Sequence, residues 1–331
     1  MSDFKFVIQQ NSHKLKFRQL TDAVEDAISN HQLEPGDMLP SVNQLMKDCQ
    51  LSRDTVFKAY NDLKLRGVVE AVPNRGYFVA RKITRVLLFL DTFKAYKEVL
   101  YHAFRDHLHK EIKVDLHFHH YNIRVFENII RESAGKYSNY IIMNFDHPRV
   151  PGITGKLPQD KLMIIDWNIH TSPDVSFVAQ DFGEPVYRCL EDSLDKIKKY
   201  NRFVFYYPPF TWHPRIAVDY FLKFVREHHL HHEVIEDPEA FRVNKGDLFF
   251  LVSDRTLAGF LDQCSEKRLV IGQDAGVISY NETPMKKYVK DGITVISTDF
   301  VQLGKKAAEF ANTGQAVRCY VPTQMHFRHS L

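Results

Sequence analysis

The chain has 331 residues, of which 44% are hydrophobic and 26% charged, with a formal net charge of +3. This length exceeds one ordinary hydrophobic core and predicts two or three domains. No apolar run reaches the roughly 20 residues of a membrane span, and the N-terminus lacks a signal-peptide core, so we expect a cytoplasmic protein without membrane association. The small net charge neither favours nor excludes a nucleic-acid partner.

The first predicted elements are three helices. Apolar residues recur at helical spacing over 15–30, which indicates an amphipathic helix. A turn follows at 34–37, where proline fixes φ and glycine admits a positive φ. Residues 39–60 then predict two short helices joined by a tight turn, with Ser41 and Ser52 as their N-caps.

The third helix is followed by a predicted hairpin. The helix buries Val56, Ala59, Tyr60 and Leu63 and ends at Gly67, and strands are expected at 68–72 and 77–80. Small polar and cationic groups stand at the start of this helix, which is typical of a helix that enters the DNA major groove. An ordinary helical hairpin is the alternative. Residues 1–82 hold 12 cationic and 10 acidic side chains, so any DNA contact must depend on placement of a few cations.

The ordered motifs of this region resemble one family. Leu39-Pro40-Ser41, Leu51–Val56, Gly67-Val68-Val69 and Arg75–Val79 are similar to the DNA-binding domain of the gluconate-repressor (GntR) family of bacterial transcription regulators. The resemblance implies a winged helix-turn-helix over residues 1–80 and a short linker at 81–84.

The resemblance also implies which side chains meet DNA. Arg53 suits a bidentate contact with guanine, and Thr55 suits a phosphate. Three positions depart from the family pattern: Asn43 and Phe57 stand where many relatives carry arginine, and Asn74 replaces the first wing glycine. These departures leave the operator sequence open. The residues expected at DNA are Ser41, Asn43, Ser52, Arg53, Asp54, Thr55, Lys58 and Arg75.

After the linker, apolar strands alternate with helices. The first set predicts strands at 86–90, 114–118, 140–145 and 162–166, and helices at 96–108 and 125–137. A second set begins near residue 183, with helices at 185–198, 215–229 and 258–266 and strands at 202–207, 233–235, 247–252, 269–271 and 292–296. Alternation of this kind predicts doubly wound sheets in two lobes that face a cleft. No Walker motif or GxGxxG supports nucleotide binding.

This second region resembles another family. Residues 178–183, Arg215, 252–254, 272–274 and 294–300 are similar to the effector domain of the lactose/galactose-repressor (LacI/GalR) family, itself similar to periplasmic sugar-binding proteins. The fusion of the two parts resembles the arabinose-repressor subgroup. The expected fold class is α/β, with an N-terminal winged helix-turn-helix and a two-lobed, doubly wound, periplasmic-binding-protein-like domain over residues 85–331.

The cleft is the expected ligand site. Charged side chains can bind sugar hydroxyls, and an aromatic ring can cover the apolar face of a sugar. Arg215 and Asp274 match positions that contact ligand in relatives, and Phe210 is a further aromatic candidate. For each aspartate, a helix N-cap or a structural salt bridge is the alternative. The expected ligand-binding residues are Asp91, Phe93, Asp146, Trp212, Arg215, Asp254 and Asp274.

Cysteine and histidine spacing argues against a metal site. The four cysteines stand far apart without a CxxC pair, which predicts free thiols. Seventeen histidines include a cluster at 228–232 and a strand group in which His117 and His119 share one face and His120 takes the other. A zinc site needs three or four converging ligands, so we expect no metal and no cofactor.

The resemblances imply a transcription regulator rather than an enzyme. We expect a homodimeric repressor of carbohydrate use that binds double-stranded operator DNA and a small effector, a pentose or a 6-deoxyhexose. An enzyme with a DNA-binding head, such as an aminotransferase fusion, would need a cofactor lysine in a long catalytic domain. A regulator that senses a non-sugar or phosphorylated metabolite is the nearer alternative, although only Arg215 is placed as a cleft cation.

Overall fold

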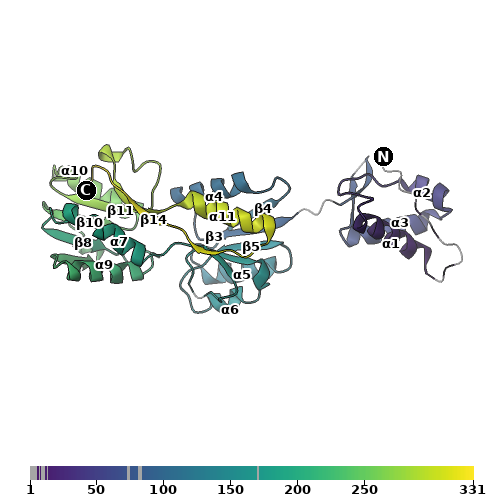
Figure 1. Cartoon of the computed structure of the whole chain (residues 1–331), viewed down its shortest axis with the longest axis horizontal. Helices are drawn as coiled ribbons and strands as arrows, with labels where there is room; N and C mark the ends of the chain where they lie inside the picture. The colour runs from purple at the N-terminus through teal and green to yellow at the C-terminus, as the bar shows by residue number, and fades with distance from the viewer. Residues whose placement is uncertain are drawn as a thin grey trace. The chain divides into compact units, whose positions relative to one another are not determined.

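The computed structural model describes residues 6, 8, 12, 14–72, 75–80, 84–169 and 171–331. These residues form two compact units, divided between residues 83 and 84, and Figure 1 colours them in chain order. Among the helices of the described part, none is both long enough and apolar enough to cross a membrane.

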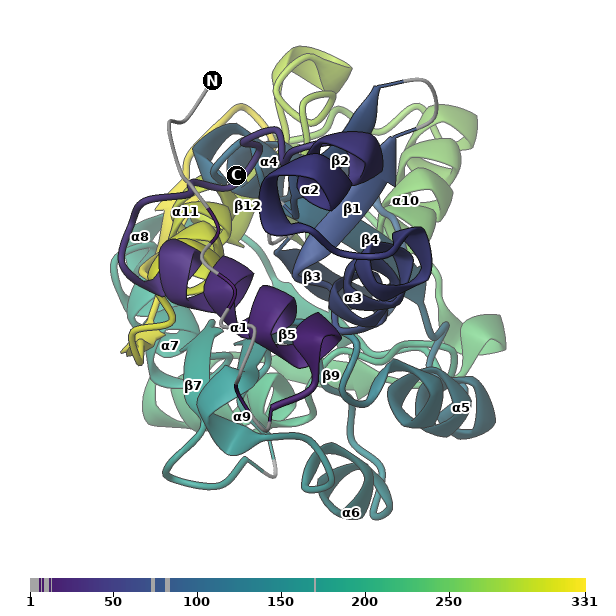
Figure 2. The same cartoon turned by 90° about the vertical axis from the view of Figure 1, so that its right-hand side faces the viewer.

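The first unit is a three-helix domain with a β-hairpin (Figure 2). The strands of the hairpin pair antiparallel, with Val69 opposite Val79 and Val72 opposite Gly76. The three helices bury one shared core, which includes Leu20, Leu45 and Val56. The predicted winged helix-turn-helix is confirmed, with elements α1 (Lys16–Ser29), α2 (Val42–Cys49), α3 (Arg53–Leu65), β1 (Val69–Val72) and β2 (Gly76–Val79).

The second unit folds into two lobes, each built on a six-stranded sheet. The strand order in lobe 1 is β13-β7-β6-β5-β3-β4, and all of its pairs are parallel. The elements of lobe 1 are β3 (Arg85–Leu90), α4 (Ala95–His107), β4 (Lys113–Phe118), α5 (Ile123–Ser133), β5 (Asn139–Met143), α6 (Val150–Thr154), β6 (Leu162–Asp166), β7 (Ser176–Ala179), α11 (Phe300–Thr313) and β13 (Arg318–Tyr320).

Lobe 2 has the order β14-β12-β11-β10-β8-β9, and only the β12–β14 pair is antiparallel. The predicted two-lobed, doubly wound architecture is therefore confirmed. The elements of lobe 2 are α7 (Glu184–Glu191), α8 (Leu194–Ile197), β8 (Arg202–Tyr206), α9 (Ile216–Glu227), β9 (His232–Ile235), β10 (Asp247–Leu251), α10 (Asp254–Glu266), β11 (Gly276–Tyr280), β12 (Thr294–Thr298) and β14 (Thr323–His326).

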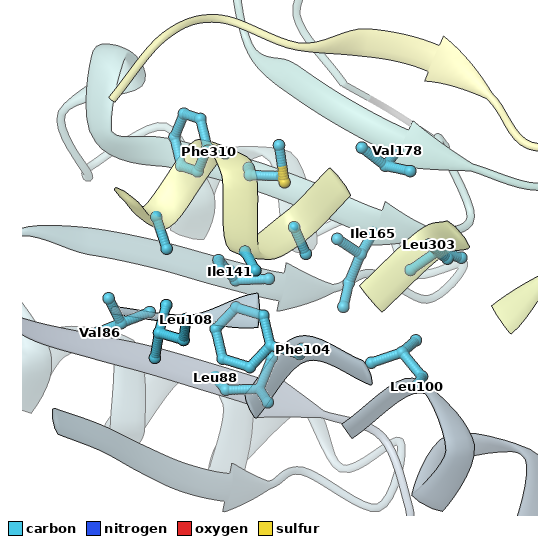
Figure 3. Packing of buried hydrophobic residues seen from close by; sticks show 14 of the residues in the cluster. Val86, Leu88, Leu100, Phe104, Leu108, Ile141, Ile165, Val178, Leu303 and Phe310 are labelled. Atoms are coloured by element: carbon cyan, nitrogen blue, oxygen red, sulfur yellow. The ribbon is translucent and has the colours of Figure 1, made fainter. Parts of the chain in front are cut away.

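Each sheet is covered on both faces by helices. In lobe 1, α4 and α11 pack on one face, where Phe104 lies beside Leu88 and Leu303 beside Ile165 in one buried cluster (Figure 3). The other face packs against α5 and α6, through Phe126 and Ile153. In lobe 2, α7 and α9 cover one face and α10 the other. Burial on both faces explains why these strands are continuous apolar runs rather than alternating ones.

The two lobes do not correspond to two successive stretches of the chain. The two alternating sets in the sequence, the second beginning near residue 183, had indicated that they would. The chain passes from lobe 1 to lobe 2 after β7, returns to lobe 1 at α11, and crosses again between β13 and β14. Figure 1 shows α11 beside α4, while the C-terminus lies in the opposite lobe. Three segments therefore connect the lobes, and the Val321 N–H donates to the Ala179 carbonyl at 2.8 Å between two of them.

Three predicted elements differ from the structure. The expected strand at 269–271 is a loop that contributes only a bridge at Ile271, and the sheet instead uses β11. The helix predicted over 125–137 ends at Ser133, shortly before Gly135 with a φ of 76°. The helix predicted over 185–198 is broken at Ser193, whose hydroxyl donates to the Cys189 carbonyl at 2.5 Å.

Candidate functional site

The start of α3 is built by local hydrogen bonds. Ser52 Oγ accepts a hydrogen bond from the Thr55 backbone N–H at 3.2 Å and lies 2.7 Å from the Thr55 hydroxyl. Ser41 caps α2 in the same way, since its Oγ accepts from the Gln44 N–H at 3.2 Å. Gln50, with a φ of 54°, makes the turn between the helices. Both predicted N-caps are present, and they define the helix end that attracts phosphate.

The eight predicted DNA-contacting residues are all exposed or partly exposed on the first unit. The Arg53 guanidinium lies 5.5 Å from the centre of the Phe57 ring, and that of Arg75 lies 5.6 Å from the Phe78 ring. A cation over an aromatic face is held in place while its N–H groups point away from the ring. Phe57, where the family pattern has arginine, thus supports the neighbouring Arg53.

The wing places Arg75 at the end of the hairpin turn, directly before Gly76 with its φ of 112°. The positive φ explains why glycine stands at this position. The expected departure from the family pattern at Asn74 lies outside the described residues. The DNA contacts of all eight residues stay predictions.

A cavity of about 110 Å³ lies between the two lobes of the second unit. Lobe 1 contributes side chains that follow the carboxyl ends of β3, β4, β5 and β6, and lobe 2 contributes those that follow β8, β10 and β11. Ligands of doubly wound sheets bind at this edge of the strands. The lining residues used below are Asp91, Lys94, Tyr96, Tyr121, Asn144, Phe145, Asp166, Gln180, Phe210, Trp212, His213, Asp254 and Asn281.

Asp91 is held by a buried ion pair. Its carboxylate accepts hydrogen bonds from the fully buried Lys97 ammonium and from the Tyr121 hydroxyl, and from the Thr92 N–H at 2.5 Å. Burial by itself would raise the pKa of the Asp91 carboxyl, but the Lys97 ammonium and these hydrogen bonds hold that pKa below its usual range. Asp91 is therefore ionised, and Lys97 balances its charge.

A second ion pair lies on the opposite side of the cavity. The Lys286 ammonium lies 2.8 Å from the Asp254 carboxylate and donates to the carbonyls of Tyr280 and Asn281 at 2.8 and 2.6 Å. Lys286 is buried, and burial lowers the pKa of its ammonium despite the nearby Asp254. All three N–H donors of Lys286 are therefore used within lobe 2, and its positive charge compensates the negative charge of Asp254.

Asp166 ends β6 and adopts a φ of 73°, which is uncommon for a residue other than glycine. Its Oδ1 accepts from Gln180 Nε2 at 2.5 Å, and burial raises the pKa of its carboxyl. Gln180 Oε1 in turn accepts from the hydroxyls of Thr298 and Tyr280 at 3.1 and 3.2 Å. Gln180 thus links the cavity carboxylate to the segments that connect the lobes.

An aromatic contact joins the lobes across the cavity. The rings of Tyr121 in lobe 1 and Trp212 in lobe 2 stack at 4.6 Å with an interplanar angle of 5°. Phe145 meets the same indole edge to face at 6.1 Å. Phe210 lies at the rim, where the Arg255 guanidinium is 4.7 Å from its ring centre. The predicted aromatic residues Trp212 and Phe210 therefore line the cavity.

Four of the seven predicted ligand-binding residues do not line the cavity. Asp274 precedes β11 instead of following a strand, and it pairs with Lys245 at 2.8 Å at the opposite end of the sheet. Arg215 is exposed and pairs with Glu236 at 2.6 Å. Phe93 packs outside the cavity against the rings of Tyr101 and Phe118, and Asp146 is an exposed residue one position beyond the cavity wall.

The placement of Asp274 and Arg215 corrects the prediction for a simple physical reason. The resemblance to the LacI/GalR effector domain predicts Asp274 as a ligand-binding residue, which would require a place at the carboxyl end of a strand. Because β11 is the strand, Asn281 occupies that place. Arg215 begins α9, but its side chain turns to Glu236 and the Tyr207 ring.

Several residues that line the cavity were not among the predicted ligand-binding residues. Asp166 and Asn144 end or follow apolar strands as Asp91 does, and this shared position is the signal that could have identified them. Gln180 and Asn281 also directly follow strands, β7 and β11, but neither strand was predicted; Tyr121 lies in the loop after β4.

No group of three or more histidine, cysteine or acidic side chains in the described ranges is arranged to hold a metal ion. The four cysteines are all described, and each is a free thiol.

Comparison with known families gives one match within each of the two structural units. Residues 16–79 match the bacterial regulatory proteins of the gntR family, and residues 196–328 match the periplasmic binding protein-like domain. Neither match is to an enzyme family. The chain thus joins a GntR-type helix-turn-helix to a periplasmic-binding-protein-like domain.

Relatives match either the first unit alone or most of the chain. The HTH-type transcriptional regulator YcxD of Bacillus subtilis is 33% identical over 67 residues, 20% of this chain and 15% of its own length. The Escherichia coli mannosyl-D-glycerate transport/metabolism system repressor MngR is 33% identical over 67 residues, 20% of this chain and 28% of its own. The NTD biosynthesis operon regulator NtdR of Bacillus subtilis is 21% identical over 307 residues, 81% of this chain and 91% of its own.

Solved structures share the fold of the second unit. A LacI family transcriptional regulator from Lactobacillus casei with bound sucrose superposes with a TM-score of 0.62 at 15% identity, covering 75% of this chain and all of its own. The trehalose repressor from Escherichia coli gives 0.58 at 11% identity, covering 74% and 100%. The chain therefore combines a GntR-type helix-turn-helix with a LacI-like effector fold, and this combination is that of a transcriptional regulator.

Proposed function

We propose that the chain is a cytoplasmic, DNA-binding transcriptional repressor of carbohydrate utilisation whose operator affinity is controlled by a small sugar. The observation that carries this proposal is the inter-lobe cavity, lined by polar and aromatic side chains of both lobes, in a chain that also holds a winged helix-turn-helix. A ligand that contacts both lobes binds their closed arrangement more tightly and thereby shifts the population of the two states.

A sugar suits the lining of this cavity. Carboxylate and amide oxygens can accept from hydroxyl groups, and the Trp212 and Phe210 rings can cover an apolar sugar face. The Lactobacillus casei neighbour was solved with sucrose and also with glucose, at similar fold likeness. A GntR-type helix-turn-helix on such a domain resembles the arabinose-repressor subgroup, which supports a repressor that its sugar releases from DNA.

A phosphorylated ligand is the second candidate. Lys94 is the one lysine or arginine among the described lining residues, and it is exposed. Lys97 and Lys286 lie behind the wall and are already paired with aspartates. A phosphate would need several available N–H donors, so this lining favours a sugar without phosphate.

The partner on the DNA side is a double-stranded operator with two-fold symmetry, bound by a homodimer. The N-terminus of α3 would enter the major groove with Ser52, Arg53 and Thr55, and Arg75 would reach the neighbouring backbone or minor groove. Asn43 and Asp54 would lie beside them.

Substitution of Arg53 by alanine tests the DNA site. We expect Arg53→Ala to weaken binding of a fluorescent DNA fragment from upstream of the chain's own gene by about 1–3 kcal/mol, measured by anisotropy at fixed salt. Lys110→Ala removes one exposed charge from the second unit and should leave the affinity unchanged. Equal affinities of Arg53→Ala and the parent chain would remove Arg53 from the interface.

A sugar titration tests the sensing part. Pentoses, 6-deoxyhexoses and hexoses are added to the preformed protein–DNA complex, and a ligand that closes the cavity should lower the anisotropy. Complete insensitivity of the complex to all three sugar classes would contradict sugar control.

A further inference from the structure

Asn144, a residue of the cavity wall, has a buried carbonyl oxygen without a hydrogen-bond donor in the described part of the chain. Its side chain is only 6% exposed, and its Nδ2 donates to the Ile169 carbonyl at 3.1 Å, which fixes the orientation of the amide. Within the described ranges, no group donates to Asn144 Oδ1. Asn281 Oδ1 is a second buried acceptor of the cavity without a donor in that part of the chain. A buried acceptor without a partner is costly, so a ligand that donates to both oxygens is favoured.

Not every carboxylate of the cavity has a cationic side chain as its partner. Asp91 is paired with Lys97 and Asp254 with Lys286. Asp166 forms no ion pair with any residue of the described ranges, and its one hydrogen bond comes from the neutral amide of Gln180. Lys94 is exposed, where water screens its charge. No described residue therefore pairs with the Asp166 carboxylate, and burial, which raises the pKa of this carboxyl, disfavours its ionised form until a cationic group binds beside it.

The groups around Asp166 cannot supply that positive charge. The Lys97 ammonium acts on Asp166 only through its charge, because it is hydrogen-bonded to Asp91 and Thr92. The phenols of Tyr96 and Tyr121 stay neutral, because burial and the neighbouring carboxylates raise their pKa. A ligand that encloses Asp166 would also remove its remaining water, and an unpaired buried carboxylate is strongly unfavourable.

We propose that the inter-lobe cavity selects an amino sugar, and that Asp166 pairs with the protonated amine of that ligand while Asn144 and Asn281 accept from its hydroxyls. This inference rests on the proposed sugar-sensing function and narrows it to one ligand class. An ammonium group offers three donors and one positive charge, so it satisfies the carboxylate that a neutral hydroxyl leaves uncompensated.

Pairs of sugars that differ only in an amino group in place of a hydroxyl test the effect of ligand charge at nearly constant ligand shape. Glucosamine is compared with glucose, and galactosamine with galactose, at neutral pH in an amine-free phosphate buffer. N-acetylglucosamine keeps the substituent but not its charge. Binding is followed by tryptophan emission, because both tryptophans of the chain line the cavity. We expect an amino sugar to bind at least about tenfold more tightly than its neutral counterpart, as for a hydrogen bond to a charged group.

Asp166→Asn tests the assigned residue. The asparagine can still accept from Gln180, so the fold should be kept, which thermal unfolding verifies. The variant should bind amino and neutral sugars with about equal affinity. Asp262→Asn is the control, because it removes an exposed carboxylate of α10 outside the cavity and should retain the amine preference.

The outcomes distinguish this inference from the proposed function. Neutral sugars that bind as tightly as their amines would overturn the inference and leave sugar sensing intact. An amine preference that survives Asp166→Asn would overturn the assignment of Asp166. A chain whose emission responds to no sugar of either kind would overturn both the inference and the proposed sugar sensing.

Discussion

His119, at the carboxyl end of β4, shows how one buried side chain depends on its protonation state. It is fully buried, its Nδ1 accepts from the Tyr121 N–H at 3.1 Å, and its Nε2 lies 3.1 Å from the Met143 carbonyl. Only the neutral ring with its proton on Nε2 satisfies both contacts. Burial lowers the pKa of His119 to about 4, although the nearby Asp91 acts in the opposite direction.

This histidine predicts a pH dependence of stability. Its pKa is 6.5 when unfolded and about 4 when folded, so the unfolded chain binds the proton first as the pH falls. The stabilisation is complete above about pH 6.5 and is lost as the pH falls toward 4, which amounts to about 2 kcal/mol between pH 7.5 and 5. Urea unfolding at both pH values should show that His119→Gln, which cannot titrate, loses less stability than the parent chain. Equal losses would contradict the assignment.

The buried pair of Lys97 and Asp91 supports the cavity wall more by mutual compensation than by net attraction. Removing one partner leaves the other charge buried without compensation, which costs about 3–5 kcal/mol, whereas removing both is far less costly. Asp91 also accepts a hydrogen bond from the Tyr121 hydroxyl. It therefore orients the Tyr121 ring and is not free to accept from a ligand.

At the scale of elements, α11 and α4 approach each other closely in lobe 1. Gly304 of α11 faces the backbone of α4, and a Cβ at this position would lie 2.4 Å from the Leu100 carbonyl oxygen and 2.9 Å from the Phe104 nitrogen. The backbone of a helix cannot yield as a flexible side chain can. The returning helix α11 therefore depends on this glycine to complete lobe 1.

Alanine substitution at two helical glycines tests the contact. In an ordinary helix, glycine to alanine stabilises by up to about 1 kcal/mol. Gly304→Ala should instead destabilise the second unit by about 1–3 kcal/mol because of overpacking. Gly259→Ala in α10 is the control, since its Cβ would meet only the Phe241 ring at 3.5 Å and should be neutral or stabilising. Urea unfolding should therefore give a lower free energy of unfolding for Gly304→Ala than for the parent chain, and an equal or higher one for Gly259→Ala; a stabilised Gly304→Ala would refute the close packing.

In the second unit as a whole, connecting segments and contacts across the cavity hold the two lobes together. Three connecting segments join them, and the Tyr121–Trp212 stack bridges the cavity. Gln180, in the connecting segment that follows β7, contacts both Asp166 of lobe 1 and Thr298 at the end of β12 in lobe 2. A ligand at Asp166 would therefore act on Gln180, a residue that connects the two lobes.

The stack can be followed by fluorescence without any ligand. In a Trp167→Phe background, Trp212 is the only tryptophan. We expect Tyr121→Ala, in the opposite lobe, to uncover one face of the indole and increase acrylamide quenching. Phe93→Ala removes an exposed ring of the same lobe outside the cavity and should leave quenching unchanged. Unchanged quenching in Tyr121→Ala would mean that the lobes do not meet at this stack in solution.

The sequence by itself determined the local elements, the winged helix-turn-helix and the α/β class of the second unit. Helical periodicity, the caps Ser41 and Ser52, and apolar strand runs depend on neighbouring residues, so they can be recognised in one dimension. Only the tertiary structure decided the path of the chain between the lobes and the membership of the cavity. Asp274 and Arg215, which were predicted to bind the ligand, do not line the cavity, whereas Asp166 and Gln180 do. The sequence could not decide this, because strand order and connecting segments depend on contacts between residues far apart in the chain.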